Sequence, residues 1–104
     1  MIARTWHGRV PRSKAEAYYR YLERTGLADY RSTPGNKGVL VLREDVGDVT
    51  HFTLTSLWES LEAVQRFAGA DFTTAHYYAE DDDFLLEREP GVRHAVVLLA
   101  ELQK

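Results

Sequence analysis

The chain contains no cysteine, and this absence excludes several kinds of chemistry at once. Disulfide bonds, thiolate metal sites, iron–sulfur clusters and cysteine nucleophiles all need that residue. The sequence also lacks the Gly-x-Ser-x-Gly turn of serine hydrolases and the glycine-rich loops that bind nucleotide phosphates. We therefore expect neither nucleophilic hydrolysis nor a nucleotide cofactor.

Long apolar runs are absent as well. The longest, residues 95–100, is far shorter than the roughly 20 residues of a transmembrane helix, and the first residues lack the apolar segment of a secretory signal. A formal net charge of -3 disfavours nucleic acid, which proteins bind through clustered Lys and Arg. We expect a cytoplasmic protein whose partners include neither membranes nor nucleic acids.

The remaining composition is that of a globular protein. Of the 104 residues, 44% are hydrophobic and 28% are charged, which fits one folded domain over residues 1–104. Segments rich in β-branched residues predict strands at residues 2–10, 38–44, 49–58 and 92–102. Turn-forming residues at 46–48 predict that the second and third strands form a hairpin.

Two helices are predicted between these strands. Ser13 and Glu16 have the spacing of a capping box at the start of the first helix, and Gly26 is placed to end it before a loop over residues 29–37. The apolar stripe of this helix consists of Ala15, Tyr18, Tyr19 and Leu22. Because one turn cannot point Tyr18, Tyr19 and Tyr21 inward together, at least one of them should lie at a rim or interface.

Ser60 is predicted to cap the second helix, which covers residues 61–68 and ends at Gly69. A further short helix is predicted to start at Asp71. The acidic run Glu80–Asp83 is interpreted as a solvated loop, because it lacks the spacing of a calcium loop. A metal site there is the less favoured alternative.

The order strand, helix, strand, strand, helix, strand predicts an α+β fold of the ferredoxin-like βαββαβ type, with an antiparallel sheet and its helices on one face. Trp6, Trp58 and the Val and Leu residues of the second and last strands are more than that face is expected to cover. Burial of the open sheet face against a second copy predicts a homodimer, a dimeric α+β barrel.

Several strings resemble the antibiotic-biosynthesis-monooxygenase-like superfamily of dimeric α+β barrel proteins, which includes small heme-degrading monooxygenases. The strings are Leu57-Trp58-Glu59-Ser60, Ala70-Asp71-Phe72 and Ala75-His76, with Ala63 and Phe67 between them. The resemblance implies the dimeric fold. It also implies the activity of the branch that oxidises polyphenolic aromatics with molecular oxygen and without metal or flavin.

In the heme-degrading branch, the histidine that ends this segment is the axial iron ligand, and its match is His76. That branch also has an asparagine near the end of the first strand and a tryptophan on the second helix, where this chain has His7 and Phe67. The resemblance thus implies no cofactor, or alternatively heme bound by His76.

The predicted topology brings all four histidines to one pole of the domain: His7, His51, His76 and His94. Imidazole exchanges protons near neutral pH and binds metals. We expect His76 or His7 to be the catalytic base, with His51 and His94 beside the substrate. Separate histidines without a shared role are the alternative.

Aromatic side chains near that pole predict a flat apolar pocket. The candidate substrate-binding residues are Phe67, Phe72, Tyr77 and Tyr78. Packing in the core or in the dimer interface is the alternative for each.

Three functions follow from these patterns. The first is a monooxygenase-like enzyme that acts without a cofactor on a small, flat aromatic or polyketide-like substrate. The second is a heme-binding or heme-degrading monooxygenase with His76 on the iron. The third is a non-catalytic dimeric binding or stress-response module, which Arg4 and Arg9 beside a tyrosine-filled pocket would favour.

Overall fold

The computed structural model describes residues 1–103. The strands are β1 (Ile2–Pro11), β2 (Asn36–Val46), β3 (Val49–Trp58) and β4 (Arg93–Val96). The helices are α1 (Ala15–Arg24), α2 (Gly26–Ser32) and α3 (Leu61–Ala68), with short 3-10 turns η1 (Arg12–Lys14) and η2 (Ala79–Asp83). No helix in this part of the chain is long and apolar enough to cross a membrane.

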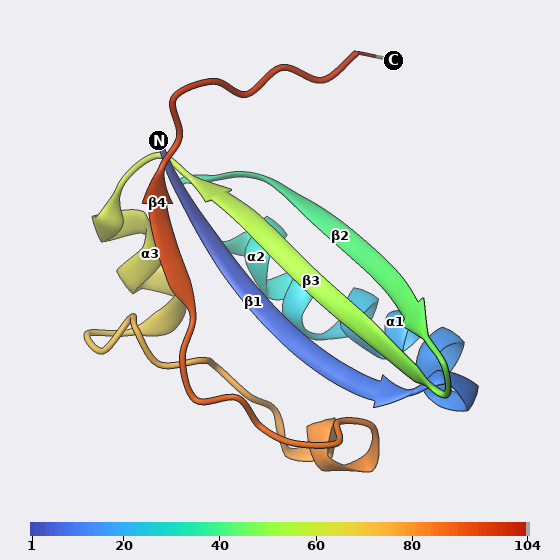
Figure 1. The fold of residues 1–104 in the computed structure, drawn as a ribbon. Coiled ribbons are helices and arrows are strands. Elements are labelled where there is room, and N and C mark those ends of the chain that lie inside the picture. Colours follow the sequence, from blue (N-terminus) through green and yellow to red (C-terminus); the bar gives the residue numbers. More distant parts are fainter. Residues whose placement is uncertain (104) are drawn as a thin grey trace.

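The strands form one sheet in the order β2-β3-β1-β4, and each neighbouring pair is antiparallel. β1 and β3 pair along their whole length, from Ile2 opposite Trp58 to Pro11 opposite Val49. Figure 1 shows α1, α2 and α3 on one side of this sheet and the other side uncovered. The predicted α+β, ferredoxin-like arrangement is confirmed.

Alternation along the strands separates a covered sheet face from an open one. In β1, the even-numbered residues from Arg4 to Val10 are buried beneath the helices, while the odd-numbered residues between them are half-buried on the other side. Trp6 and Trp58 are only 7% and 0% exposed, so the helix layer accommodates both. Of the apolar set expected to exceed the covered face, the tryptophans are thus buried, whereas Leu40, Leu42 and Val96 remain exposed.

The first helical region differs from its prediction in several details. Ser13 lies in η1, and α1 begins without a side-chain cap, so no capping box forms. Gly26 does not end the first helix but begins α2, which replaces the first part of the predicted loop over residues 29–37. Tyr19 is exposed and Tyr21 is buried in its place, so Tyr19 is the rim residue of the three tyrosines.

The second helix follows its prediction. The Ser60 side chain accepts a hydrogen bond from the backbone N–H of Ala63 at 3.2 Å, and Gly69 follows the helix with φ 84°. The short helix predicted at Asp71 is wrong. The Asp71 carboxylate instead accepts hydrogen bonds from the hydroxyls of Thr73 and Thr74, and the segment forms a turn.

The last strand is much shorter than predicted. β4 ends at Val96, and residues 97–103 continue outside the sheet, as the projecting C-terminal segment in Figure 1 shows. Leu98, Leu99 and Leu102 are exposed on this segment. An apolar run alone cannot distinguish a strand from an extended tail, because both suit Val and Leu.

Candidate active site

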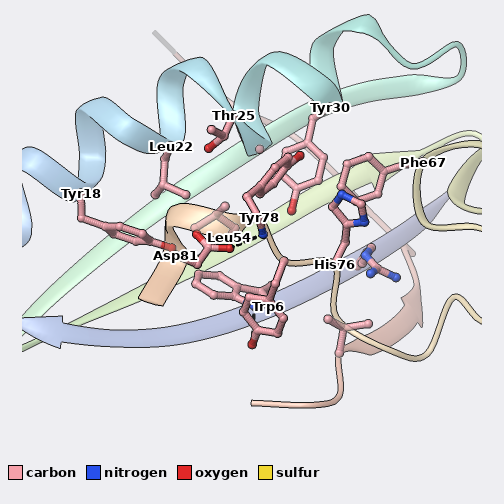
Figure 2. Close-up of a pocket in the computed structure, with 14 residues that line it drawn as sticks. Trp6, Tyr18, Leu22, Thr25, Tyr30, Leu54, Phe67, His76, Tyr78 and Asp81 are labelled. Carbon is pink, nitrogen blue, oxygen red and sulfur yellow. Dashed lines mark hydrogen bonds between the residues drawn. The ribbon is translucent and has the colours of Figure 1, made fainter. Parts of the chain in front are cut away.

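A narrow pocket with a cavity volume of about 30 Å³ lies between the covered face of the sheet and the layer of α1 and α2. Figure 2 shows Tyr18 and Asp81 at one end of the pocket and Phe67 and His76 at the other. The lining residues are Arg4, Trp6, Tyr18, Leu22, Thr25, Gly26, Tyr30, Leu54, Phe67, His76, Tyr77, Tyr78, Asp81 and Val92. Its aromatic walls are those of a small-molecule site, but its enclosed space is far below the roughly 300–1,000 Å³ of such sites, so an aromatic ligand can enter only if lining side chains move.

Trp6 forms the floor of the pocket because β1 leaves room for its indole. A Cβ atom at Gly8 would lie 2.3 Å from Cη2 of Trp6, so only glycine at this position allows the ring to lie over the strand. The indole Nε1–H donates to the Tyr77 hydroxyl at 3.2 Å, and that hydroxyl donates to the Glu89 carbonyl at 2.5 Å. These hydrogen bonds orient Trp6 and Tyr77, and all of the groups they join are neutral.

Asp81 is a buried acid at one end of the pocket, only 4% exposed. It turns inward because its carboxylate accepts the backbone N–H of Tyr78 at 2.6 Å, at the start of η2. Burial raises the pKa of Asp81, and the Tyr78 hydrogen bond opposes this only in part. The site therefore contains a carboxyl group that holds a proton more strongly than an exposed aspartate does.

The tyrosines near Asp81 stay protonated at ordinary pH. Burial, reinforced by Asp81, raises the pKa of Tyr18. Burial also raises the pKa of Tyr78, whose hydroxyl donates to the Asp29 carboxylate. Asp81 is thus the acidic group of this end, with neutral phenols around it.

Arg4 supplies a buried positive charge at the other end, with only 2% of its surface exposed. Its Nη1 donates to the Phe72 carbonyl and, at 3.2 Å, to Nε2 of His94, while Nη2 donates to the Thr74 carbonyl at 3.2 Å. The guanidinium carbon lies 5.7 Å from the centre of the Phe67 ring. Burial lowers the pKa of Arg4 and, together with the Arg4 charge, that of His94, so His94 serves as a neutral acceptor.

His76 lies at the same end as Phe67, as its position in the sequence suggested. Its ring centre is 5.5 Å from that of Phe67 and 5.0 Å from that of Tyr78. The residue is exposed overall, and no residue in the described range forms a hydrogen bond with its imidazole. His76 is therefore available to a ligand at the pocket but is not oriented by a polar partner.

The histidines do not gather at one pole. His7 and His51 lie on the open face, where Nε2 of His7 is 2.9 Å from Nδ1 of His51 and Nδ1 of His7 is 2.6 Å from the Glu89 carboxylate. His76 and His94 lie on the covered side. The single four-histidine pole is wrong, because alternation along β1 directs odd-numbered and even-numbered residues to opposite faces.

The predicted substrate-binding residues likewise divide between the two faces of the sheet. Phe67, Tyr77 and Tyr78 line the pocket together with His76. Phe72 and His94 lie behind Arg4, with their rings edge to face at 5.2 Å. His7 and His51, on the other side of the sheet, do not reach this pocket.

The two charged residues of the pocket, Arg4 and Asp81, were not among the site residues selected from the sequence. Arg4 alternates with Trp6, so the spacing of β1 was the signal that both share the covered face. Asp81 is one of four consecutive acidic residues, and only the geometry of η2 selects it for burial. The interpretation of the whole run as a solvated loop is wrong at this one residue. Among residues 1–103, no three His, Asp or Glu side chains converge in a way that could hold a metal ion.

No protein-family model and no curated protein matches the sequence. Solved structures do match. One is a mutant of MhuD with two manganese protoporphyrin IX molecules bound per active site, with TM-score 0.67, 19% identity, and 99% of this chain and 100% of that chain covered. A provisionally named antibiotic biosynthesis monooxygenase from Nitrosomonas europaea has TM-score 0.68 and 17% identity, with 95% of this chain and 100% of that chain covered.

A third match is a monooxygenase from the gene ActVA-Orf6 of Streptomyces coelicolor in complex with nanaomycin D. It has TM-score 0.59 and 16% identity, with 99% of this chain and 91% of that chain covered. The chain has the fold of antibiotic-biosynthesis-monooxygenase-like proteins. At these identities the likeness concerns the fold, as the strings around Trp58 and His76 predicted, and the reaction has to be argued from the pocket.

Proposed function

We propose that this protein is a monooxygenase-like enzyme that oxidises a small, flat phenolic or polyketide-like aromatic compound in the pocket beneath α1 and α2, without metal or flavin. The observation that carries the proposal is a single aromatic-walled pocket that contains a buried acid of raised pKa, Asp81, and a buried cation, Arg4. The fold shared with monooxygenases supports it by analogy.

The reaction begins with removal of a phenolic proton, which leaves an electron-rich anion able to reduce molecular oxygen. One oxygen atom replaces the two hydrogens of a ring methylene as a carbonyl, and the other oxygen atom leaves as water with those hydrogens. Aromatic walls exclude bulk water, so the charge of the anion is stabilised by fixed groups rather than by solvent.

Two pocket residues are suited to accept the proton. Asp81 is buried, and its raised pKa makes its carboxylate a stronger base than an exposed aspartate. His76, the residue favoured from the sequence, lies at the opposite end beside Phe67. His7, the other histidine favoured there, is on the open face and has no part in this proposal.

Oxygen uptake tests the proposal. With 1,8-dihydroxyanthrone as substrate, the protein should consume oxygen above the uncatalysed rate. Loss of the proton acceptor, in Asp81→Asn or His76→Ala, should lower kcat by about 10²- to 10⁴-fold. His7→Ala on the open face is the matched control and should keep the full rate. Uptake at the uncatalysed rate by the unaltered protein would contradict an enzymatic role.

Heme is the alternative cofactor, and the residues around His76 do not fit it well. A histidine that ligates a metal normally donates its second N–H to a carboxylate, carbonyl or water; no protein group in the described range accepts one from His76, so the exposed ring is left to solvent. The ring instead packs against Phe67 and Tyr78. A hemin titration should leave the Soret band of free hemin unchanged, whereas a shift that disappears in His76→Ala would restore this alternative.

A binding module without turnover is supported by one specific observation, since Arg4 lies in a pocket that Tyr18, Tyr30 and Tyr78 partly fill. Ligand binding without oxygen uptake would favour it. For the assembly, we propose a homodimer through the open sheet face, where Leu40 and Leu42 are exposed on β2. A homodimer of this kind would leave the pocket of each protomer on its own helix side.

A further inference from the structure

Arg4 is a buried charge without a counter-ion. Its side chain is 2% exposed, and none of the salt bridges among residues 1–103 includes it. The other arginine of β1 is paired: Arg9, on the opposite face of the strand, contacts the Glu87 carboxylate through both Nε and Nη2. A buried, unpaired cation is costly, so its retention calls for a reason.

The contacts that hold Arg4 are all with neutral acceptors. They are the carbonyls of Phe72 and Thr74 and the Nε2 atom of His94. These three contacts occupy three of the five N–H groups of a guanidinium, leaving Nε–H and one N–H of Nη2 without a partner in the described range. Carbonyl and imidazole acceptors position the group, but they do not neutralise its charge.

The place of Arg4 in the pocket indicates where a negative charge would bind. Arg4 lines the cavity beside Phe67 and Tyr30, and the one buried carboxyl group of the pocket, Asp81, lies at the other end. Phe67 offers an aromatic surface next to the guanidinium. An aromatic ligand with an acidic substituent would satisfy both surfaces together.

We propose that Arg4 is the receptor for a carboxylate, or an equivalent oxyanion, on a flat aromatic ligand bound in this pocket. A guanidinium presents its free donors in a planar fork that matches the two oxygens of a carboxylate. Binding in this orientation directs the far end of the ligand toward Asp81 rather than His76. The inference deepens the proposed function by defining the substrate class as an anionic hydroxyaromatic compound, and for its reaction it rests on that function.

Anaerobic titration tests the anion preference on the unaltered protein. The test ligands are 6-hydroxy-2-naphthoate and its neutral isostere 6-hydroxy-2-naphthamide, and quenching of Trp6 fluorescence follows binding. A hydrogen-bonded charge pair in a buried site should make the naphthoate bind at least about tenfold more tightly. Equal affinities, or no binding of the naphthoate, would overturn the proposal.

Two variants assign the preference to Arg4. Arg4→Gln should abolish the naphthoate preference and leave binding of the naphthamide within about threefold, because the neutral ligand never used the charge. Arg9→Gln, which removes an arginine from the open face of the same strand, should keep the preference. A preference that persists in folded Arg4→Gln would show that Arg4 only ties the segment around Phe72 and Thr74 to β1.

Arg4→Lys covers the case in which Arg4→Gln fails to fold. It keeps the charge but not the planar fork, so the naphthoate preference should shrink without vanishing. Because all titrations exclude oxygen, they do not depend on turnover. A retained preference without oxygen uptake would overturn the proposed enzyme alone, whereas oxygen uptake without a preference would overturn the role of Arg4 alone.

Discussion

The two faces of the sheet carry similar residue types but offer different chemistry. On the covered face, Arg4 and Asp81 are almost fully buried and lie at opposite ends of an aromatic pocket. On the open face, His7 is close to both His51 and Glu89, but its side chain is 35% exposed and that of Glu89 is 36% exposed. Solvent stabilises the charges on the open face, whereas the buried charge of Arg4 is shielded from water and forms no salt bridge among residues 1–103.

This difference shows that closeness of polar groups does not by itself make a site. The contact between His7 and Glu89 is short, at 2.6 Å, yet it joins two partners that satisfy each other. Arg4 has no such partner in the described range, and it is one of the residues that line the pocket. Unsatisfied buried charge indicates a ligand better than a close pair does.

The largest expected difference between the two faces concerns the loss of unfolding free energy when a leucine is truncated. Leu54→Ala removes a side chain that is 2% exposed on the covered face, and it should lower the free energy of unfolding by about 2–5 kcal/mol. Leu42→Ala makes the same change at a side chain that is 52% exposed on the open face, and in the dissociated monomer it should cost less than about 0.5 kcal/mol. Urea denaturation of both variants, at protein concentrations below the dissociation constant of the dimer, measures the contrast. Equal losses would mean that the open face is packed as tightly as the pocket face.

The next largest expected effect is on the dissociation constant of the proposed homodimer. If two open faces meet, Leu42→Glu buries an unpaired carboxylate in the interface and should weaken the dimer by about tenfold or more. Leu61→Glu on α3 is the matched control, because Leu61 is similarly exposed but lies in the helix layer. Sedimentation equilibrium measures both dissociation constants. A dimer weakened by Leu61→Glu and not by Leu42→Glu would place the interface elsewhere.

The smallest effect concerns the pH dependence of folding. Because burial raises the pKa of Asp81 in the folded state, that state binds more protons than the unfolded chain between the two pKa values. The stability of the protein should therefore fall as the pH rises through this window. Asp81→Asn should remove this loss, so the variant should be more stable than the unaltered protein at neutral pH and gain nothing at acid pH.

Denaturation curves at a series of pH values test this sign. The matched control is Asp83→Asn, which changes an exposed acid of the same run and should leave the pH profile unaltered. A profile in which Asp81→Asn loses stability at neutral pH would mean that the Asp81 carboxylate stabilises the fold.

Much of the scaffold was predictable because local patterns specify it. β3 has the predicted bounds, and Ser60 caps α3 as its spacing with Ala63 requires. The errors lie where tertiary contacts decide. Gly26 could end a helix or begin one, and the apolar residues 97–102 suit a strand, but β4 finds partners on β1 only as far as Val96.

The site was less predictable for two physical reasons. Spacing along β1 could have placed His7 and Arg4 on opposite faces, but it does not say which face the helices cover. The burial of Asp81 depends on its hydrogen bond with the N–H of Tyr78, which no composition pattern reveals. His76 and its aromatic neighbours were found because they lie close together in the sequence.

The central claim is that ligands bind on the covered face at Arg4 and not at the paired histidines of the open face. A titration of the protein with 6-hydroxy-2-naphthoate, followed by NMR of the two indole N–H groups and four histidine rings, tests it directly. We expect shifts for the indole of Trp6 and the rings of His76 and His94, with His7 and His51 unchanged. Shifts confined to His7 and His51 would contradict it.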